Sequence, residues 1–325
     1  MAENDDPAGT ATIGTIGECL IDFTPIEQDG VTTGFNLHPG GSPLNVAVAV
    51  ARLGHPAAFA SRVSTDFFGD RIIAHLLEHG VRIDLLRRAS EPTTLAFVAY
   101  VERDAVYSFR SEGAADTLLS ESDLDAEGFV ALSALHFGSI SLLHPVTAAT
   151  VLALAGRLKG RVTLTFDPNV RPTLVADWAA YGEVIHACLR LADLVRLSEE
   201  DLAAWRAGTG EDLLALAAAA APVVVTRAGD GSDLYIAGST LHVPARPVAV
   251  VDTVGAGDAY MAGLLVGLDE TGALDALRTG LPGPDRWRSA MELAATTAAL
   301  TCERRGAHPP TRAEIETPPQ AKVHA

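Results

Sequence analysis

Short apolar runs alternate with helical patterns along most of this chain, and that alternation restricts the fold more than any other feature. Strand-like runs occupy residues 13–17, 57–63, 134–138, 162–166, 194–197, 223–226 and 248–251. Helical patterns lie between most of them, at 44–53, 67–79, 147–158, 178–191 and 200–205. Repeated β–α–β units predict an α/β fold, a mainly parallel sheet with helices on both faces. Ligands of such sheets bind beyond the carboxyl ends of the strands.

Two segments interrupt this alternation. Residues 20–38 follow the first strand without a helix, and residues 93–101 and 106–110 are alternating runs joined by a predicted hairpin at 102–105. Together they predict a small separate sheet. Residues 279–285 are rich in Pro and Gly and predict a surface loop.

Composition excludes several classes of protein. The 325 residues are 48% hydrophobic, which is ample for a large core, and the net charge of −17 disfavours nucleic acid and anionic membranes as partners. The longest apolar run, 213–225, is shorter than the ~20 residues that span a bilayer. The amino-terminal residues are acidic, unlike a signal peptide, and the three cysteines lack metal-site spacing. We therefore expect a soluble, cytoplasmic protein.

The most informative motif is DTVGAGDAYMAGLL, residues 252–265. An acid, a Gly-Ala-Gly turn and a second acid precede a helical segment, an arrangement that directs backbone N–H groups at an anion. Gly255, Ala256 and Gly257 are the expected anion hole, and Asp258 is the candidate general base for phosphoryl transfer to a hydroxyl. Asp252 either orients the turn or approaches a cation. The alternative is an ordinary Gly-rich turn with an acid favoured by the helix dipole.

This string resembles the second signature of the ribokinase-like (PfkB) family of sugar and nucleoside kinases. The string HPGGSPLN, residues 38–45, is similar to the first signature, and FDPNVR (166–171) and ADLVRLS (192–198) resemble further landmarks. The resemblance covers about residues 13–315. It implies a three-layer α/β/α core in one kinase domain, 12–315, with a β lid from about 20–38 and 93–115. Residues 1–11 and 316–325 are expected to be flexible tails.

The resemblance also implies a group of substrate-binding residues. They are Asp22, Gly40, Gly41, Asn45, Arg110 and Arg171. Three of them have a structural alternative: Asp22 sits where the first strand is expected to end and suits a turn, Asn45 suits a helix cap, and Arg110 suits a solvated hairpin. An ionised carboxylate such as Asp22 accepts hydrogen bonds from adjacent sugar hydroxyls.

ATP and Mg²⁺ are the cofactors that the resemblance implies. Its nucleotide-binding positions match Ser198, Thr226, Gly229 and Gly231. The string SEED at 198–201 equally fits a helix capping box, and Ala228, Ala295 and Ser64 replace residues common in the family. Only two lysines occur, neither in a Gly-Lys-Ser/Thr motif, so ATP phosphates must be held by backbone dipoles, arginines and Mg²⁺.

A monovalent cation such as K⁺ is a further expectation at Asp252, with carbonyls of the loop 304–310. Pro310 stands where some relatives have a serine, so activation by K⁺ is expected to be weak.

Among sugar kinases, the segments 137–142, 167–171 and 110–116 look most like fructokinases. The expected partners are ATP and a small sugar, and the expected reaction is fructose to fructose 6-phosphate. The alternatives are a 2-keto-3-deoxygluconate kinase, a nucleoside kinase and a non-catalytic sugar sensor. Because a sheet edge exposed in the lid can pair with a second copy, a homodimer through the lid is also expected.

Overall fold

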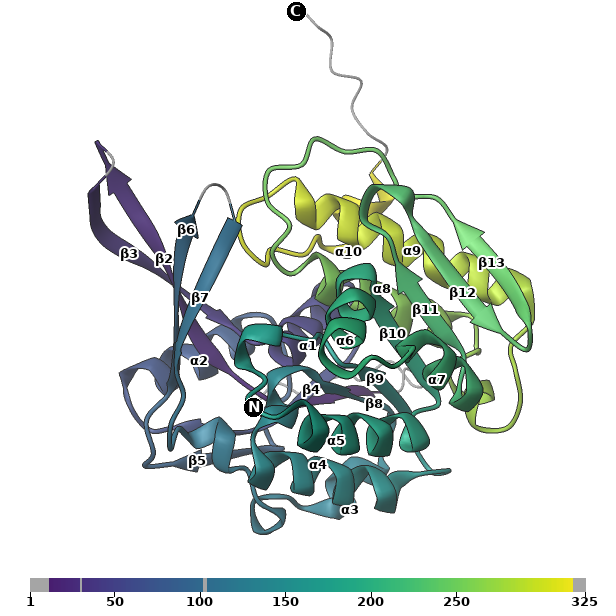
Figure 1. Cartoon of the computed structure of the whole chain (residues 1–325), viewed down its shortest axis with the longest axis horizontal. Helices are drawn as coiled ribbons and strands as arrows, with labels where there is room; N and C mark the ends of the chain where they lie inside the picture. The colour runs from purple at the N-terminus through teal and green to yellow at the C-terminus, as the bar shows by residue number, and fades with distance from the viewer. Residues whose placement is uncertain (1–11, 30, 102–103, 318–325) are drawn as a thin grey trace, which may run out of the picture.

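The main sheet determines the shape of the molecule, whose computed structural model describes residues 12–29, 31–101 and 104–317. Within these residues the sheet has nine strands in the order β13-β12-β11-β10-β9-β8-β1-β4-β5 (Figure 1). Neighbours from β11 to β5 are parallel, and β12 and β13 are antiparallel. The strands are β1 (Thr12–Ile16), β4 (Ala57–Ser64), β5 (Leu86–Ala89), β8 (Leu132–Gly138), β9 (Thr163–Asp167), β10 (Leu194–Ser198), β11 (Val223–Thr226), β12 (Ser232–Ile236) and β13 (Ser239–Val243).

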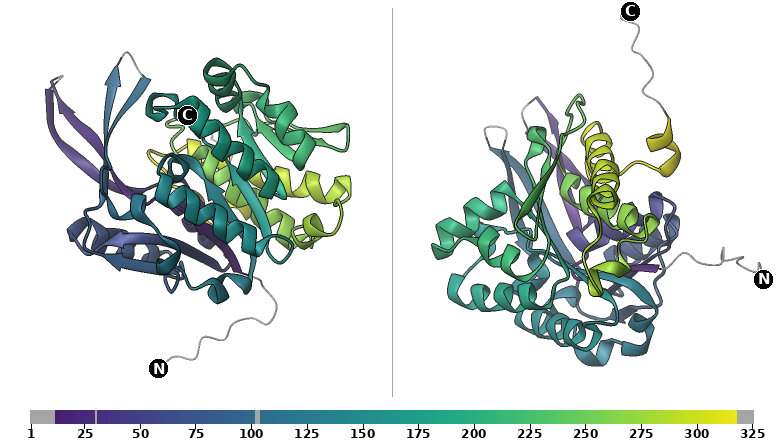
Figure 2. Two further views of the ribbon diagram at one scale, coloured as in Figure 1. Left: turned by 60° about the horizontal axis from the view of Figure 1, so that its bottom comes forward. Right: turned by 90° about the vertical axis from the view of Figure 1, so that its right-hand side faces the viewer.

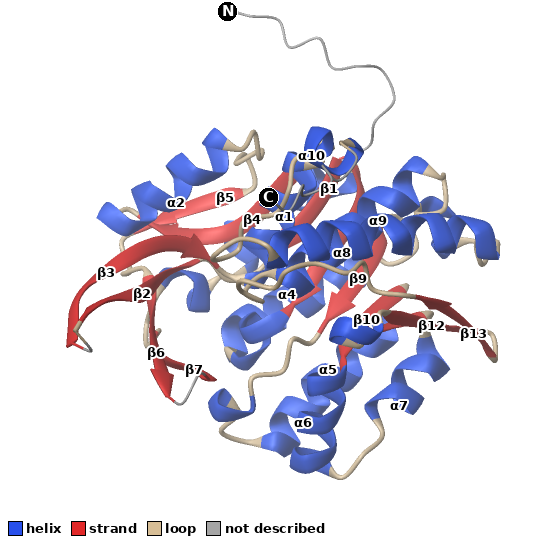
Figure 3. Cartoon of the chain, turned by 90° about the horizontal axis from the view of Figure 1, so that it is seen from above, coloured by secondary structure: helices blue, strands red, loops and turns tan. Residues whose placement is uncertain are grey.

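Helices cover both faces of this sheet (Figure 3). One face carries α1 (Ser42–Arg52), α2 (Phe67–Glu78), α8 (Ala256–Glu270), α9 (Pro284–Cys302) and α10 (Arg312–Glu316). The other carries α3 (Ala126–Val130), α4 (Pro145–Leu158), α5 (Trp178–Leu191), α6 (Glu199–Thr209) and α7 (Leu213–Ala220). Successive side chains of a strand point to opposite faces, so Val223 and Val225 enter one core and Val224 the other. The predicted three-layer fold is confirmed.

A second, smaller sheet stands beside the main one (Figure 2). Its strands, in the order β3-β2-β6-β7, are β2 (Leu20–Gln28), β3 (Val31–Gly40), β6 (Thr94–Val101) and β7 (Asp104–Arg110). We call it the lid sheet. β6 and β7 are antiparallel, as the predicted hairpin requires, although residues 102 and 103 of its turn lie outside the described residues.

The register of the lid sheet assigns each side chain to one of its two faces. Asp22 on β2 pairs with Ala96 on β6, which pairs with Phe109 on β7, so these three share a face. Ile21 pairs with Leu95, which pairs with Arg110, so these lie on the opposite face. A difference of one position along β7 therefore separates Phe109 from Arg110.

Two local predictions are wrong. Residues 244–251 form no strand, and Val250 and Val251 are 64% and 57% exposed, because this segment runs outside the sheet toward α8. An apolar run of four residues does not by itself identify a buried strand. Asp22 does not end the first strand, since β1 stops at Ile16 and Asp22 belongs to β2.

Neither end of the chain tests the predicted tails, because residues 1–11 and 318–325 lie outside the described residues. Residue 316 still belongs to α10, one position beyond the predicted domain boundary. Across the described ranges, none of the helices has the length and apolarity needed to cross a membrane.

Candidate active site

A pocket of about 320 Å³ opens where the lid sheet meets the starts of α1 and α8. Polar side chains from distant parts of the chain line much of it. The lining residues that matter below are Glu18, Asp22, Gly41, Ser42, Asn45, Ser139, Asn169, Arg171, Arg196, Gly255, Gly257 and Asp258. The pocket therefore gathers residues of both predicted signatures, although they lie some 200 positions apart in the sequence.

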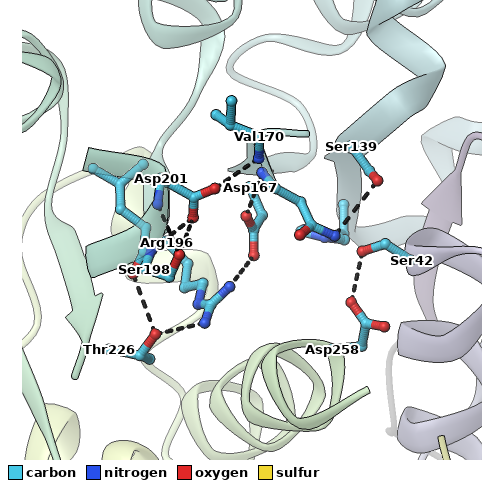
Figure 4. Close-up of polar contacts among 12 residues, drawn as sticks. Ser42, Ser139, Asp167, Val170, Arg196, Ser198, Asp201, Thr226 and Asp258 are labelled. Carbon is cyan, nitrogen blue, oxygen red and sulfur yellow. Dashed lines mark hydrogen bonds and ion pairs between the residues drawn. The ribbon is translucent and has the colours of Figure 1, made fainter. Parts of the chain in front are cut away.

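Asp258 is held on both carboxylate oxygens by α1. Ser42 Oγ donates to Oδ1 at 2.6 Å (Figure 4). Asn45 Nδ2 donates to Oδ2 at 2.8 Å. Burial raises the pKa of Asp258, while these two donors and the nearby guanidinium groups of Arg171 and Arg196 lower it. Asn45 thus contacts the candidate base directly, and its side chain does not cap the helix, which is the structural alternative to a role in substrate binding.

The turn before α8 explains why glycine is required there. Gly255 adopts φ 74°, and a Cβ atom on it would lie 2.6 Å from Cβ of Ala307. A Cβ atom on Gly257 would lie 3.0 Å from Nη1 of Arg196. The Ala256 N–H donates to the Thr253 carbonyl at 3.2 Å, so the turn itself uses it. Helix geometry leaves the N–H groups of Gly257 and Asp258 available to an anion.

Three carboxyl groups line the pocket: Glu18, Asp22 and Asp258. Burial, with a smaller contribution from the charge of Asp258, raises the pKa of Asp22 to about 7. Burial likewise raises the pKa of Glu18. A Cβ atom on Gly40 would lie 2.3 Å from Oδ2 of Asp22, so a larger residue there would displace the Asp22 carboxylate. The acidic lining suits a neutral ligand rich in hydroxyl groups.

The cationic side chains that line the pocket are Arg171 and Arg196. Arg171 is exposed, whereas Arg196 is buried at 7% exposure. Arg196 pairs with Asp167 at 2.9 Å and donates to Oγ1 of Thr226 at 2.5 Å, and its buried Nε lacks a partner among the described residues. Burial lowers the pKa of Arg196, but the carboxylates of Asp167, Asp201 and Asp258 together raise it by more, so the guanidinium stays charged. Arg196 is a buried guanidinium with an unused N–H donor, and it lies beside Gly257, where a Cβ atom would occupy the space between them. This arrangement fits a phosphate group.

Two pocket residues have strained backbones. Ser139 and Asn169 adopt φ 57° and 42°, in the left-handed region that glycine favours, and Asn169 Nδ2 lies 3.5 Å from Ser139 Oγ. Ser139 follows β8 and Asn169 follows β9, so both lie beyond the carboxyl ends of adjacent strands. Strain of this kind, about 1–3 kcal/mol per residue, is typical of functional sites.

Of the other predicted substrate residues, some line the pocket and one does not. Gly41 and Arg171 line the pocket. Arg110 is absent from its lining among the described residues, lies on the face of the lid sheet opposite Asp22, and donates to Ser108 Oγ and the Phe109 carbonyl. Its neighbour Phe109 lines the pocket instead, because adjacent residues of a strand face opposite ways.

The predicted nucleotide residues lie at the carboxyl ends of β10 and β11, outside the pocket lining. Ser198 forms a capping box with Asp201, which also accepts from the Val170 N–H at 2.6 Å. Thr226 contacts Arg196. Gly229 lies in a short 3₁₀ helix, Ala228–Asp230, and Gly231 packs so closely that a Cβ atom would lie 2.2 Å from the Val243 carbonyl oxygen.

One departure from the family pattern has a structural consequence. Ala228 adopts φ 44°, a conformation that glycine adopts without strain. Its substitution for glycine therefore leaves the loop strained by about 1–2 kcal/mol.

Asp252 joins two segments next to the anion turn. Its Oδ1 accepts from the Val254 N–H at 3.1 Å, and its Oδ2 accepts from the Gly306 N–H at 2.8 Å. The turn-orienting interpretation of Asp252 therefore has direct contacts. The carboxylate also anchors the loop around 306 against the turn at 252–254.

Several pocket residues are missing from the sequence prediction: Glu18, Ser42, Ser139 and Arg196. Arg196 carries a signal, because an arginine inside the apolar strand β10 needs a buried partner. Ser42 lies in the string 38–45, next to Gly41, whereas Glu18 lies four positions before Asp22. Ser139 has no sequence signal of its own.

A doubly covered α/β sheet, a lid sheet, and a carboxylate beside a glycine turn at a helix start define the class of phosphotransferases that act on hydroxyl groups. Residues 10–314 match the model of the pfkB family carbohydrate kinases. The chain belongs to this family. The predicted class, a carbohydrate kinase, is confirmed.

Individual relatives agree with this assignment. A fructokinase from Rhizobium leguminosarum bv. trifolii is 35% identical over 283 residues, which cover 83% of this chain and 86% of the relative. The structure of a fructokinase with bound ATP from Xylella fastidiosa has a TM-score of 0.84 at 29% identity, covering 94% and 96% of the two chains. A fructokinase double mutant from Vibrio cholerae O395, with fructose, ADP and a potassium ion, has a TM-score of 0.78 at 26% identity, covering 94% and 97%.

Proposed function

We propose that this carbohydrate kinase transfers the γ-phosphoryl group of ATP to the C6 hydroxyl of fructose, giving fructose 6-phosphate. The observation that carries this proposal is the placement of Asp258 in a pocket with Asp22 and Asn45, directly after the Gly255 turn. The base, the acceptor site and the anion site then lie within one pocket. The fructokinases among the relatives support fructose as the acceptor.

In this proposal Asp258 accepts the proton of the acceptor hydroxyl as that oxygen attacks phosphorus. The proton moves to Asp258, the new O–P bond forms, and the bond to the leaving ADP oxygen breaks. The N–H groups of Gly257 and Asp258, with the Arg196 guanidinium, stabilise the charge on the transferring phosphoryl oxygens. Asp22 accepts from sugar hydroxyls and so orients the acceptor.

Mg²⁺ is the metal that such a transfer requires, and it neutralises charge on the ATP phosphates when bound. Among the residues that the structure describes, no three His, Cys, Asp or Glu side chains are grouped to hold a metal ion. Mg²⁺ in kinase sites is bound through one or two carboxylates plus phosphates and water.

Three further features belong to this proposal. We expect weak activation by K⁺ near Asp252, because Pro310 stands in place of an oxygen ligand. Measuring the reaction rate in K⁺, Na⁺ and a bulky organic cation tests this expectation. A strong requirement for K⁺ would contradict it. A homodimer through the lid sheet and a cytoplasmic location remain predictions from the sequence. Sedimentation analysis measures whether the protein is a dimer.

The acidic lining favours a neutral sugar over a keto-acid, whose carboxylate would face Glu18, Asp22 and Asp258. The experiment compares kcat/KM for fructose, other hexoses, 2-keto-3-deoxygluconate and nucleosides, with ATP and Mg²⁺. The product is identified by its conversion to glucose 6-phosphate with an isomerase. We expect fructose to have the highest kcat/KM.

Two arginine variants sharpen the comparison. Arg171→Ala removes a cation that lines the pocket, and Arg110→Ala removes one on the opposite face of the lid sheet. If 2-keto-3-deoxygluconate is preferred and Arg110→Ala abolishes that preference, the keto-acid kinase replaces the fructokinase. Sugar binding without ADP release identifies a sugar sensor instead.

A further inference from the structure

Glu18 is a buried carboxyl group at the edge of the active-site pocket. It is 2% exposed and precedes the first strand of the lid sheet. Its partners are hydrogen-bond donors: the Ser42 N–H at 3.1 Å to Oε1, and the Ser141 N–H at 3.2 Å and Ser141 hydroxyl to Oε2. None of the arginines or lysines in the described residues forms an ion pair with it. Burial destabilises an ionised carboxyl group unless hydrogen bonds or opposite charges compensate for the lost hydration.

The contact with Ser42 supplies what the start of α1 lacks. The N-cap residue of α1 is Gly41, which offers no side chain to the first helical N–H groups. Glu18 accepts from the first of them, at Ser42, from outside the helix. A negative charge at this end is favoured by the helix dipole, so Glu18 acts as the missing cap.

The same residue, Ser42, reaches the candidate base. Its backbone N–H donates to Glu18, and its hydroxyl donates to Oδ1 of Asp258 at 2.6 Å. Gly41 permits this approach, because it adopts φ 114° and a Cβ atom on it would lie 2.6 Å from the Glu18 carbonyl oxygen. One residue therefore links a buried carboxylate to the pocket carboxylate.

We propose that Glu18 and Ser42 are positioning residues for the base: Glu18 fixes the first turn of α1, and the Ser42 hydroxyl then holds Asp258 ionised and oriented toward the acceptor hydroxyl. This inference rests on the proposed function of Asp258. It assigns no contact between Glu18 and the substrate. A donor to the ionised form of a carboxyl group lowers its pKa, so losing the Ser42 hydroxyl raises the pKa of Asp258.

Other charges also face Asp258. Asp22 on β2, Asp167 at the end of β9 and Glu18 disfavour its ionised form, whereas Arg171 and Arg196 favour it. Since Asp22 and Asp258 interact, the acid limb of the rate profile is a property of the pair. The Ser42 variants leave all these charges in place, so the comparison between them carries the test.

The experiment measures kcat against pH from 5 to 9 with saturating fructose, ATP and Mg²⁺. Ser42→Ala should move the acid limb upward by about one pH unit, so that kcat falls about tenfold on that limb and approaches wild type at high pH. Ser42→Thr keeps a hydroxyl and should restore the wild-type limb. Glu18→Gln should shift the limb in the same direction but less, because losing the Glu18 charge favours ionised Asp258 and so opposes the effect of losing the cap. The double variant should shift it no further than Ser42→Ala alone, because Glu18 acts through Ser42.

Thr15→Val is the matched control. Thr15 is buried, and its hydroxyl donates to the Pro43 carbonyl at 2.7 Å, so this variant loosens the same turn without touching Asp258. It should lower Tm and leave the limb unchanged. An equal shift in Thr15→Val, or an unshifted limb in folded Ser42→Ala, overturns the proposal. Wild-type kcat in Asp258→Asn overturns the base assignment itself, which is a different failure.

Discussion

At the scale of single residues, the pocket brings acidic side chains together that would repel one another in isolation. Burial raises the pKa of Asp258, and two donors and two guanidinium groups act against that rise. Among the described residues no such side-chain donor contacts the Asp22 carboxylate, and burial raises its pKa to about 7. The two carboxyl groups therefore differ in their partners: donors hold Asp258, whereas the oxygens of Asp22 are available to ligand hydroxyls.

Asp258→Asn tests the base. The variant keeps the size of the side chain and removes its proton acceptor, so kcat should fall roughly 10²–10⁴-fold while Tm changes little. Glu270→Gln, at the far end of the same helix, is the control and should keep wild-type kcat. A folded Asp258→Asn protein with nearly normal kcat would exclude this residue as the base.

Asp22→Ala tests the acceptor site. Loss of the hydrogen bonds from sugar hydroxyls should raise the fructose KM by about one order of magnitude, since an unpaired polar group costs about 1–3 kcal/mol. The KM for ATP should change little. Thr24→Ala, on the same face of β2 but absent from the pocket lining among the described residues, should alter neither constant. Equal increases for both substrates would indicate a structural role for Asp22.

At the scale of secondary-structure elements, the start of α8 depends on backbone shape as much as on side chains. Gly255 occupies the left-handed region and lies against Ala307, in the loop that Asp252 anchors. Gly272, just beyond the other end of α8, has a similar φ of 64° but open space where a Cβ atom would stand. The two glycines therefore share a left-handed backbone conformation, but only Gly255 packs closely against another residue, Ala307.

We expect Gly255→Ala to reduce kcat at least tenfold, because the clash with Ala307 displaces the turn that supplies the N–H groups. Gly272→Ala should destabilise the fold by about 1 kcal/mol through backbone strain alone and leave kcat unchanged. Steady-state kinetics and thermal unfolding of both variants separate the two effects. If both lose the same activity, general strain in α8 and not the turn contact explains the loss.

At the scale of the whole molecule, buried ionisable groups link stability to pH. Asp116 is buried at the base of the lid sheet, where Thr94 Oγ1 donates to it at 2.5 Å. Burial raises the pKa of Asp116, like that of Asp22, to about 7. Burial lowers the pKa of His75 to about 4 and of His136 to about 3.

These shifts predict that the apoprotein loses stability between pH 6.5 and 8. The folded state keeps the protons of Asp22 and Asp116 up to about pH 7, whereas the unfolded chain releases them near pH 4, so their contribution is lost as pH rises through 7. His75 and His136 are neutral in the folded state, and their contribution to the free energy of unfolding changes little above pH 6.5. The expected loss in unfolding free energy is about 1–2 kcal/mol.

Urea unfolding across this pH range measures the change. The double variant Asp22→Asn with Asp116→Asn should abolish most of it, because neither amide titrates. A free energy of unfolding that is constant or rising from pH 6.5 to 8 in the wild type would contradict the assignment of these two groups.

The sequence by itself determined the architecture and the centre of the site. Alternation of apolar runs specifies the α/β sheet because parallel strands require helical crossovers. The 252–265 motif specifies Asp258 and its turn because an anion site of this kind is built from contiguous residues. Asp22 and Asn45 followed from a family pattern, and both line the pocket.

Only the tertiary structure decided which other residues reach the pocket. Glu18 follows β1, Ser139 follows β8 and Arg196 lies within β10, and the order of strands in the sheet brings them to one pocket. Phe109 and Arg110 differ by one position, so the register of the lid sheet decides which one faces the pocket. The run 248–251 is apolar yet exposed, because periodicity over four residues carries no information about the neighbours that bury a strand.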